Sequence, residues 1–435
     1  MLIQKIKISG YKNISDTIIK FQNLIALVGI NNYGKSNVIE AIDFAREFIL
    51  SNPEMKHKMM RYLKAIPLNI TIANDNFVFE MEYISKLDQK TVFVDYEIEF
   101  KWFKNNVDDK GCKIVGENLK IKLDKKGQKY SSYINRSENK AFYRTSETGR
   151  CDKNISIERD NLIINKINSY DDLFYVDIIK ELNTLKFDVN SFLDSTNAFD
   201  VAPTLKFKNS SLFGLDKKTG DNISEIVYNL KREDKKSYRL LENSFKELFP
   251  TIEYINILSF DITNGTRNIK IPNDAPFIIP DKIYRLRVKE DTNNQEMDFA
   301  NLSNGTKRIF LLLTSAILAD KYKFPLIAFE ELEDCIHPSL FEQLLIILSK
   351  IVNNCRIVIT SHSPFLIQYL DLDKIYISIP SKRGVATFKK IKKSKQNSLK
   401  NEAKEYGISV GGYLFDLIIK CYDGEYDLLS FMESE

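Results

Sequence analysis

The chain has 435 residues, 43% of them hydrophobic, which is enough to bury a sizeable core and to form two or three domains. The net charge is only +4, from 63 basic and 59 acidic residues, so the overall charge does not indicate a nucleic-acid binder, although a local basic face stays open. Five scattered cysteines without a CxxC pair indicate neither a disulfide framework nor a zinc site, and they favour the reducing cytoplasm. No secretory pattern opens the chain, and the longest apolar run, residues 309–319, is too short to cross a bilayer, so we expect no membrane partner.

The first elements lead to a glycine-rich loop. Residues 2–9 largely alternate apolar and polar side chains, which predicts an edge strand, and a second strand is expected near 17–21. Residues 23–28 predict a short buried strand. Apolar positions at helical spacing follow from Asn37, and they predict a helix that ends near Pro53.

The loop from Gly29 to Ser36 has the Walker A form: a glycine, four residues, and then Gly-Lys-Ser. Its glycines permit a tight turn whose N–H groups face a phosphate chain, and the next helix adds the partial charge of its N-terminus. Lys35 would supply a full positive charge near the terminal phosphates, and the Ser36 hydroxyl would ligate Mg²⁺. The alternative is a chance glycine turn. We predict that ATP is held by Gly29, Asn31, Asn32, Tyr33, Gly34, Lys35, Ser36 and Asn37.

The middle of the chain changes character twice. Residues 77–83 and 92–100 alternate, as antiparallel strands with one solvated face do, and residues 124–153 predict a polar loop or hairpin. Residues 165–250 predict helices, with no sustained heptads that would support a long coiled-coil arm.

The last part alternates between strands and helices. Mixed strands are expected near 257–262 and 284–288, and the elements after them are a helix at 309–320, strands at 326–329 and 356–359, and helices at 340–352 and after Pro364. This order predicts the parallel half of a nucleotide-binding core. Because the Walker A helix belongs to the same core, the β-rich and helical middle should be inserted material.

Two acids end the predicted strand at 326–329. In P-loop NTPases such a strand delivers carboxylates to the metal and the attacking water. Glu330 would hold Mg²⁺, and Glu331 would act as the general base on the water. An ordinary strand end with solvated acids is the alternative.

Two further stretches suggest contacts with phosphate. Ser303 is a plausible N-cap before the apolar helix, where Gly305 would leave the N-terminus open to an anion; simple capping is the alternative. His362 ends the strand at 356–359 with Thr360 and Ser361, and it could contact the γ-phosphate or be a satisfied core histidine.

Together these motifs resemble the ATP-binding-cassette head of the RecF/SMC/OLD superfamily. The resemblance rests on the Walker A stretch, Leu-Ser-x-Gly at 302–305, Glu330–Glu331 and Thr-Ser-His at 360–362. The opening residues 8–13 are similar to the adenine-side strand of that group, which adds Lys12 to the nucleotide residues, and residues 220–250 resemble the helical segment of its arm-less ATPases. The fold so implied is α/β: an ABC-type head with a parallel RecA-like core, an antiparallel β subdomain and an inserted helical region.

The resemblance implies a dimer or higher oligomer that forms through the ATP sites. Ser303, Asn304 and Gly305 of one copy would close over the γ-phosphate held by the other, and His362 would be the switch histidine. The chain departs from the family at Glu330, where an aspartate is usual, and at Leu332, where a proline is usual. The longer Glu330 suggests slow turnover. The implied ranges are an N-terminal lobe at 1–160, a helical insertion at 161–255, a C-terminal lobe at 256–400 and a helical tail at 401–435.

The stretch after Phe365 is too short for the Toprim domain of OLD-type nucleases as well as the rest of the head. The chain is therefore similar to the stand-alone ATPases of Septu- and PARIS-type anti-phage systems, which work with a separate nuclease or toxin. The first hypothesis is such a sensor or regulator subunit in the cytoplasm. The alternatives are a RecF-like DNA-binding repair or loading ATPase, for which the basic run 389–395 could serve, and a nucleotide-gated scaffold that barely hydrolyses ATP.

Overall fold

The computed structural model describes residues 1–30, 33–103, 113–138, 140–190, 198–199, 206–207, 223–261, 277–278, 282–379 and 384–433. The chain divides into two compact units. Unit 1 contains residues 1–191, 323–332 and 353–435, and unit 2 contains residues 192–322 and 333–352. The four lobe ranges expected from the sequence stay a prediction.

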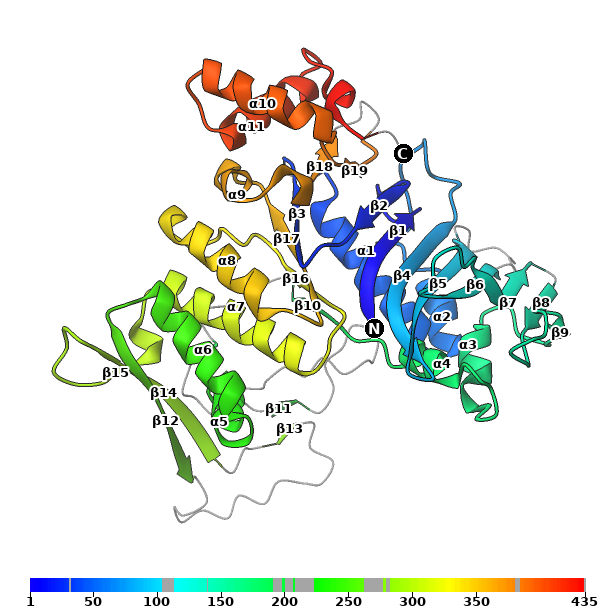
Figure 1. The fold of residues 1–435 in the computed structure, drawn as a ribbon, viewed down its shortest axis with the longest axis horizontal. Helices are drawn as coiled ribbons and strands as arrows, with labels where there is room; N and C mark the ends of the chain where they lie inside the picture. Colours follow the sequence, from blue (N-terminus) through cyan, green and yellow to red (C-terminus); the bar gives the residue numbers. More distant parts are fainter. Residues whose placement is uncertain are drawn as a thin grey trace. The chain divides into compact units, whose positions relative to one another are not determined.

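A six-stranded sheet in unit 1 carries the Walker A strand (Figure 1). Its strands, in spatial order, are β10 (Phe187–Asn190), β16 (Leu326–Phe329), β17 (Arg356–Ser361), β3 (Leu24–Val28), β18 (Ile375–Ile379) and β19 (Thr387–Lys389). All neighbours are parallel except β18 and β19. Strands β3, β16 and β17 are buried along their whole length, as strands covered on both faces are. The predicted parallel core is therefore confirmed.

The second sheet of unit 1 is antiparallel. Its order is β2 (Thr17–Lys20), β1 (Leu2–Ser9), β4 (Phe77–Leu87), β5 (Lys90–Lys101), β6 (Lys113–Leu123), β7 (Ser131–Ser137), β8 (Lys140–Tyr143) and β9 (Lys153–Asn154). Strand β4 alternates buried and half-buried residues, as predicted. The prediction of an edge strand at 2–9 is wrong, because β1 pairs with both β2 and β4. Alternation shows that one face is solvated but not how many neighbours a strand has.

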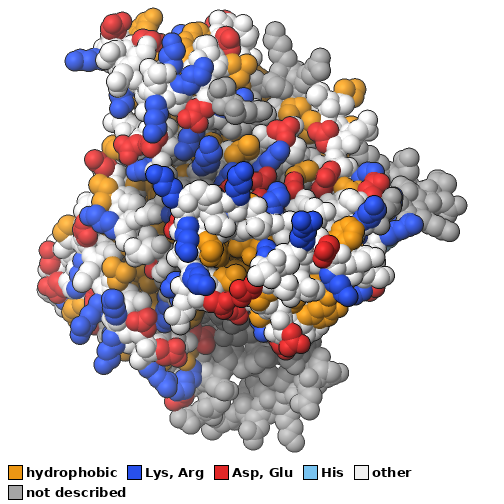
Figure 2. Space-filling view, turned by 45° about the vertical axis from the view of Figure 1, so that its right-hand side comes forward, with side chains coloured by type: hydrophobic (Ala, Val, Ile, Leu, Met, Phe, Trp, Pro, Cys, Tyr) orange, Lys and Arg blue, Asp and Glu red, His pale blue; other side chains and the backbone are white. Residues whose placement is uncertain are grey.

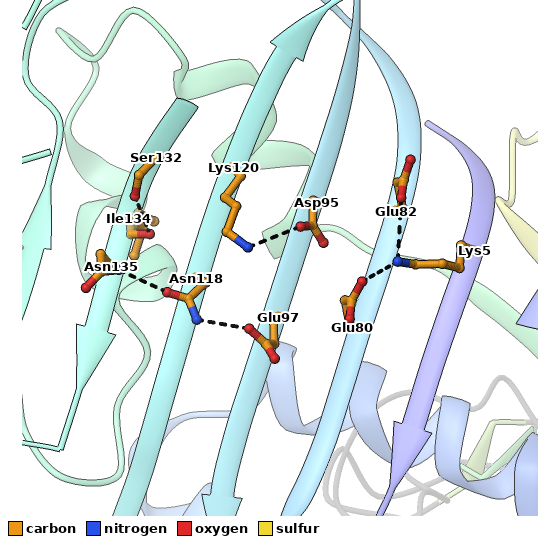
Figure 3. A network of polar contacts seen from close by, with 10 residues as sticks. All are labelled: Lys5, Glu80, Glu82, Asp95, Glu97, Asn118, Lys120, Ser132, Ile134 and Asn135. Carbon is orange, nitrogen blue, oxygen red and sulfur yellow. Dashed lines mark hydrogen bonds and ion pairs between the residues drawn. The ribbon is translucent and has the colours of Figure 1, made fainter. Parts of the chain in front are cut away.

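Polar side chains cover the outer face of this sheet and connect neighbouring strands (Figure 3). Lys5 on β1 pairs with Glu80 at 2.5 Å and Glu82 at 3.6 Å on β4. Lys120 on β6 reaches Asp95 on β5 at 3.5 Å. These cross-strand pairs fix the register of the face that is not buried.

Helix α1 (Lys35–Leu50) packs aromatic side chains against the antiparallel sheet. The Phe48 ring stacks on Phe100 of β5 with centroids 4.6 Å apart, and Phe77 of β4 stacks on Phe100 at 4.9 Å. Trp102 closes this cluster and donates from Nε1 to the Gly10 carbonyl at 2.7 Å. The helix that begins at the Walker A lysine is thus anchored by a rigid core.

Unit 1 contains several further helices. They are α2 (Pro53–Met59), α3 (Ile163–Lys166), η1 (Ile167–Ser169), α4 (Val176–Asn183), α9 (Pro364–Tyr369), η4 (Leu372–Lys374), α10 (Lys393–Glu405), α11 (Val410–Tyr422) and η5 (Leu428–Phe431). Helix α11 packs on α9 (Figure 1).

Unit 2 combines helices with short sheets. Its helices are α5 (Ile223–Glu233), α6 (Lys235–Leu248), η2 (Phe299–Asn301), α7 (Asn304–Lys321), η3 (Pro338–Leu340) and α8 (Phe341–Ile351). Its strands are β12 (Ile252–Asp261), β14 (Lys282–Glu290) and β15 (Met297–Asp298) in one sheet, and β11 (Lys206–Phe207) and β13 (Phe277–Ile278) in another. The prediction of helices over 165–250 holds for α4, α5 and α6, but it is wrong at β10 (Phe187–Asn190) and β11 (Lys206–Phe207), which are strands.

Surface charge is mixed on the face shown in Figure 2, where basic and acidic side chains are interspersed. This agrees with the small net charge. None of the helices in the described ranges has the length and apolar character that crossing a bilayer requires.

Candidate functional site

The Walker A loop joins β3 to α1 at the carboxyl end of the parallel sheet. Gly34 is the N-cap of α1 with φ +82°, a left-handed conformation that favours glycine. The Lys35 side chain is 8% exposed, and its Nζ donates to the carbonyls of Gly29 at 2.7 Å and Ile30 at 3.0 Å. The ammonium thus lies over the loop where a phosphate chain would lie. Asn31 and Asn32 lie outside the described residues.

The first acid after β16 meets the last residue of the Walker A motif. The Ser36 hydroxyl lies near enough to the Glu330 carboxylate to influence its pKa, although the two residues are far apart in the sequence. Burial, and then the charges of Glu40 and Glu331, raise the pKa of Glu330, while the Ser36 hydroxyl opposes the rise. A hydroxyl beside a carboxylate fits Mg²⁺, which takes oxygen ligands and usually shares them with substrate phosphates.

The second acid has a special backbone conformation. Glu331 has φ +47°, and its N–H donates to Thr360 Oγ1 of β17 at 3.1 Å. The N–H of Leu332 donates to the Thr360 carbonyl at 3.4 Å. Two bonds to one residue of β17 therefore fix where the chain turns after the acid pair.

His362 follows the end of β17, which lies between β3 and β16 (Figure 1). The carboxyl ends of parallel strands meet at one edge of a sheet, which is where α/β folds bind ligands. Topology thus brings the loop of Lys35, the acids Glu330 and Glu331, and His362 to one edge. His362 is exposed there, which disfavours the alternative of a buried core histidine.

Lys12 lies beside α1 and pairs with Glu40, one helical turn after Ser36. Its backbone N–H donates to the Ala65 carbonyl at 2.8 Å, and its charge acts on Glu330. Asn37, another predicted nucleotide residue, donates from Nδ2 to Asn13 Oδ1 at 2.7 Å. Sequence reasoning missed Glu40, although its i, i+4 spacing from Ser36 on a predicted helix was the available signal.

The predicted signature residues belong to unit 2, at the N-terminus of α7. Ser303 is the N-cap, and its Oγ accepts from the Thr306 N–H at 3.1 Å. Ser303 and Asn304 are exposed. Simple capping therefore occurs, and it leaves both residues accessible; their predicted contact with a second copy stays a prediction.

The segment after the acids supports this turn within unit 2. A Cβ on Gly305 would lie 2.3 Å from the Cys335 carbonyl oxygen, so only glycine fits without a shift. Arg308 on α7 pairs with Asp334 at 3.7 Å and is almost completely buried. The signature turn and residues 334–335 therefore form one packed element.

The basic run 389–395 is partly used inside unit 1. Lys390 Nζ lies 4.7 Å from the centroid of the Tyr376 ring, and Lys395 Nζ lies 5.5 Å from that of Phe431. Lys392 donates to the Ser430 carbonyl at 3.2 Å. These contacts favour a packing role for three of the five lysines in this run.

Comparison with known proteins matches the chain to one family and one fold. Residues 24–368, well over half of the chain, match the model of the family described as "AAA domain, putative AbiEii toxin, Type IV TA system". Among solved structures, the chain resembles an SMC head bound to the C-winged helix domain of ScpA, with 14% identity, a TM-score of 0.51, and coverage of 92% of this chain and 100% of that chain. The SMC head domain of Thermotoga maritima aligns at 11% identity and a TM-score of 0.43, covering 90% of this chain and 100% of that one. No curated protein matches.

Proposed function

Because the chain belongs to this family of AAA domains and has the fold of an SMC-type ATPase head, we propose that it binds ATP at the Lys35 loop and hydrolyses it with Mg²⁺. One observation carries this proposal: the parallel pairing of β3, β17 and β16 brings the Lys35 loop and the acids Glu330 and Glu331 to the same edge of the sheet. No described group of three or more His, Cys, Asp or Glu side chains could hold a metal by itself. A serine and a carboxylate that share the ion with phosphates are the arrangement expected for Mg²⁺.

The residues then have separate roles. Lys35 and the N–H groups at the start of α1 bind the phosphate chain, and Ser36 and Glu330 hold Mg²⁺, which neutralises charge that develops on the phosphates. Glu331 accepts a proton from the attacking water, and His362 contacts the γ-phosphate. Lys12 lies close enough to Glu40 and Glu330 to contribute to nucleotide binding.

The proposal includes association of two or more copies through the ATP sites. Ser303 and Asn304 are exposed at the N-terminus of α7, where backbone N–H groups favour an anion. They would close over the γ-phosphate bound by another copy. The tight packing of Gly305 against Cys335 supports a preformed turn that needs little ordering.

For the biological role, we propose a sensor or regulator subunit in the cytoplasm that acts with a separate effector, a nuclease or toxin, in anti-phage defence. The family description, which names the AbiEii toxin and a type IV toxin–antitoxin system, supports such a setting. The RecF-like alternative predicts ATP-dependent duplex binding that weakens steeply with salt.

The test combines two variants with ATP binding and turnover. Lys35→Ala should abolish ATP binding, and Lys350→Ala on α8 is the control for a lost lysine charge. Unchanged ATP affinity in Lys35→Ala would refute the nucleotide site. Co-purification with the products of neighbouring genes tests the effector, and salt-dependent DNA binding without a co-purifying protein would favour the alternative.

A further inference from the structure

The last variable residue of the Walker A motif contacts the C-terminal part of the chain. The Tyr33 ring lies edge-on to Tyr422, the last residue of α11, with centroids 5.4 Å apart and an interplanar angle of 81°. Their hydroxyls also interact, and burial followed by this hydrogen bond raises the pKa of Tyr33 to about 12. Such an edge-to-face pair contributes beyond the area that it buries.

The backbone of Tyr33 makes a separate contact with strand β18. Ser378 on β18 is fully buried and donates from Oγ to the Tyr33 carbonyl at 2.5 Å. The strand therefore fixes the main chain of Tyr33, and α11 fixes its ring. Because Gly34 and Lys35 follow directly, these two contacts set the direction in which the loop enters α1.

Helix α11 also contacts the segment that follows His362. A Cβ on Gly411 would lie 2.1 Å from the Pro364 carbonyl oxygen, so the start of α11 touches the start of α9. Pro364 follows His362 by two residues. Leu414, Leu417 and Ile418 of α11 are buried, which makes the helix a rigid support.

We infer that Tyr422 is a positioning residue for the ATP site, and that α11 braces the phosphate loop against the segment after His362. This inference rests on the proposed ATP binding and assigns a part of it to the C-terminal helix. Tyr422 is 55% exposed, so its side chain can be removed without opening the core. Without this contact, the loop would have to be ordered when the nucleotide binds, and the free-energy cost of that ordering would weaken binding.

The experiment measures ATP affinity and turnover in the full-length chain. Tyr422→Ala should weaken ATP binding about 3- to 10-fold, which is the range an aromatic pair supports. Turnover at saturating ATP and the melting temperature should stay close to those of the wild type. Ile419→Ala is the matched control, since Ile419 lies on the same helix and is 47% exposed. Tyr422→Phe keeps the ring and should retain most of the affinity.

A double-mutant cycle separates positioning from a merely structural role. Tyr33→Leu removes the ring from the loop side, and Tyr33→Leu/Tyr422→Ala should bind ATP no more weakly than the worse single variant. Wild-type affinity in Tyr422→Ala, or equal losses in Tyr422→Ala and Ile419→Ala, would overturn the inference while ATP binding stands. Absence of ATP binding in the wild type would instead overturn the proposed function, and this inference with it.

Discussion

The N–H of Glu331 donates to Thr360 Oγ1 at 3.1 Å, which ties the proposed general base to the strand that leads to His362. Glu331 adopts φ +47°, a conformation that non-glycine residues seldom adopt. The hydrogen bond helps to hold it there. The two catalytic candidates are therefore positioned by a single strand end.

Replacing Thr360 by Val should lower turnover. The isosteric side chain leaves the Glu331 N–H without this acceptor, at a cost of about 1–3 kcal/mol, so the turn that carries the carboxylate relaxes. We expect turnover about 10-fold lower with ATP affinity little changed, measured by steady-state phosphate release. Thr360→Ser keeps the hydroxyl and is the control; equal losses in both variants would contradict the role of this bond.

Replacing Glu331 by Gln should trap ATP. The amide keeps the size of the side chain but cannot accept the proton from water, so hydrolysis should fall by about 100-fold or more while ATP stays bound. Size-exclusion chromatography with ATP should then show a persistent dimer or higher oligomer. Glu342→Gln, an exposed change on α8, should behave as the wild type. Normal turnover in Glu331→Gln would exclude it as the base.

As the pH is lowered, Mg²⁺-dependent ATP binding should begin to weaken at a higher pH than it would if Glu330 had the pKa of an ordinary glutamate. Burial and the charges of Glu40 and Glu331 raise the pKa of Glu330 above 4.5, and its protonation would remove the proposed metal ligand. Affinity is therefore expected to fall as the pH drops through this raised pKa. Titrations of Mg²⁺ between about pH 5 and pH 8 test this.

Glu40→Gln supplies the comparison for that titration. It removes a like charge beside Glu330 and releases Lys12 from its ion pair. Both changes lower the pKa of Glu330, so the midpoint should move to lower pH. An unmoved midpoint would mean that another group controls the transition.

Adding a methyl group at Gly305 should impair association but not ATP binding. The new Cβ would meet the Cys335 carbonyl at 2.3 Å, so the signature turn or the 334–335 segment must shift. ATP-dependent oligomer formation in Gly305→Ala should fall, measured by analytical ultracentrifugation. The double variant Gly305→Ala/Glu331→Gln is the internal control, because its ATP affinity should be unchanged. If its oligomers are as stable as those of Glu331→Gln alone, the turn at 303–305 has no role in association.

Removal of the buried Glu117 carboxylate should destabilise unit 1. Glu117 on β6 is fully buried and accepts from the N–H groups of Ile163 at 2.5 Å and Ile164 at 3.0 Å, which caps α3. Glu117→Ala leaves these two buried donors without their acceptor, whereas Arg136 keeps its bonds to the Asn161 and Glu158 carbonyls, and we expect the free energy of unfolding in urea to fall by about 3 kcal/mol. Glu138→Gln, which changes an exposed carboxylate on the linker between β7 and β8, should leave the unfolding midpoint unchanged.

The sequence alone determined the local parts of this protein. Short contiguous patterns predict the strand, glycine loop and helix around Lys35, the acids after an apolar strand, and the N-cap Ser303. They do so because hydrophobic periodicity and helix capping depend on only a few neighbouring residues. The parallel core and its antiparallel partner sheet followed from the same patterns. Their order along the chain indicated a parallel nucleotide-binding core, and the resemblance of the motifs to a known superfamily implied the rest of the head.

Only the tertiary structure decided which distant residues meet. The insertion of β17 between β3 and β16, the interior place of β1, the Lys12–Glu40 pair and the contact between Tyr33 and Tyr422 all join segments that are remote in the chain. Such pairings depend on how whole sheets and helices pack, and a periodic pattern carries no information about the neighbour that an element will find. The physical reason is that the spacing of apolar residues determines which face of an element is buried, whereas the packing of the whole core determines which element lies against that face.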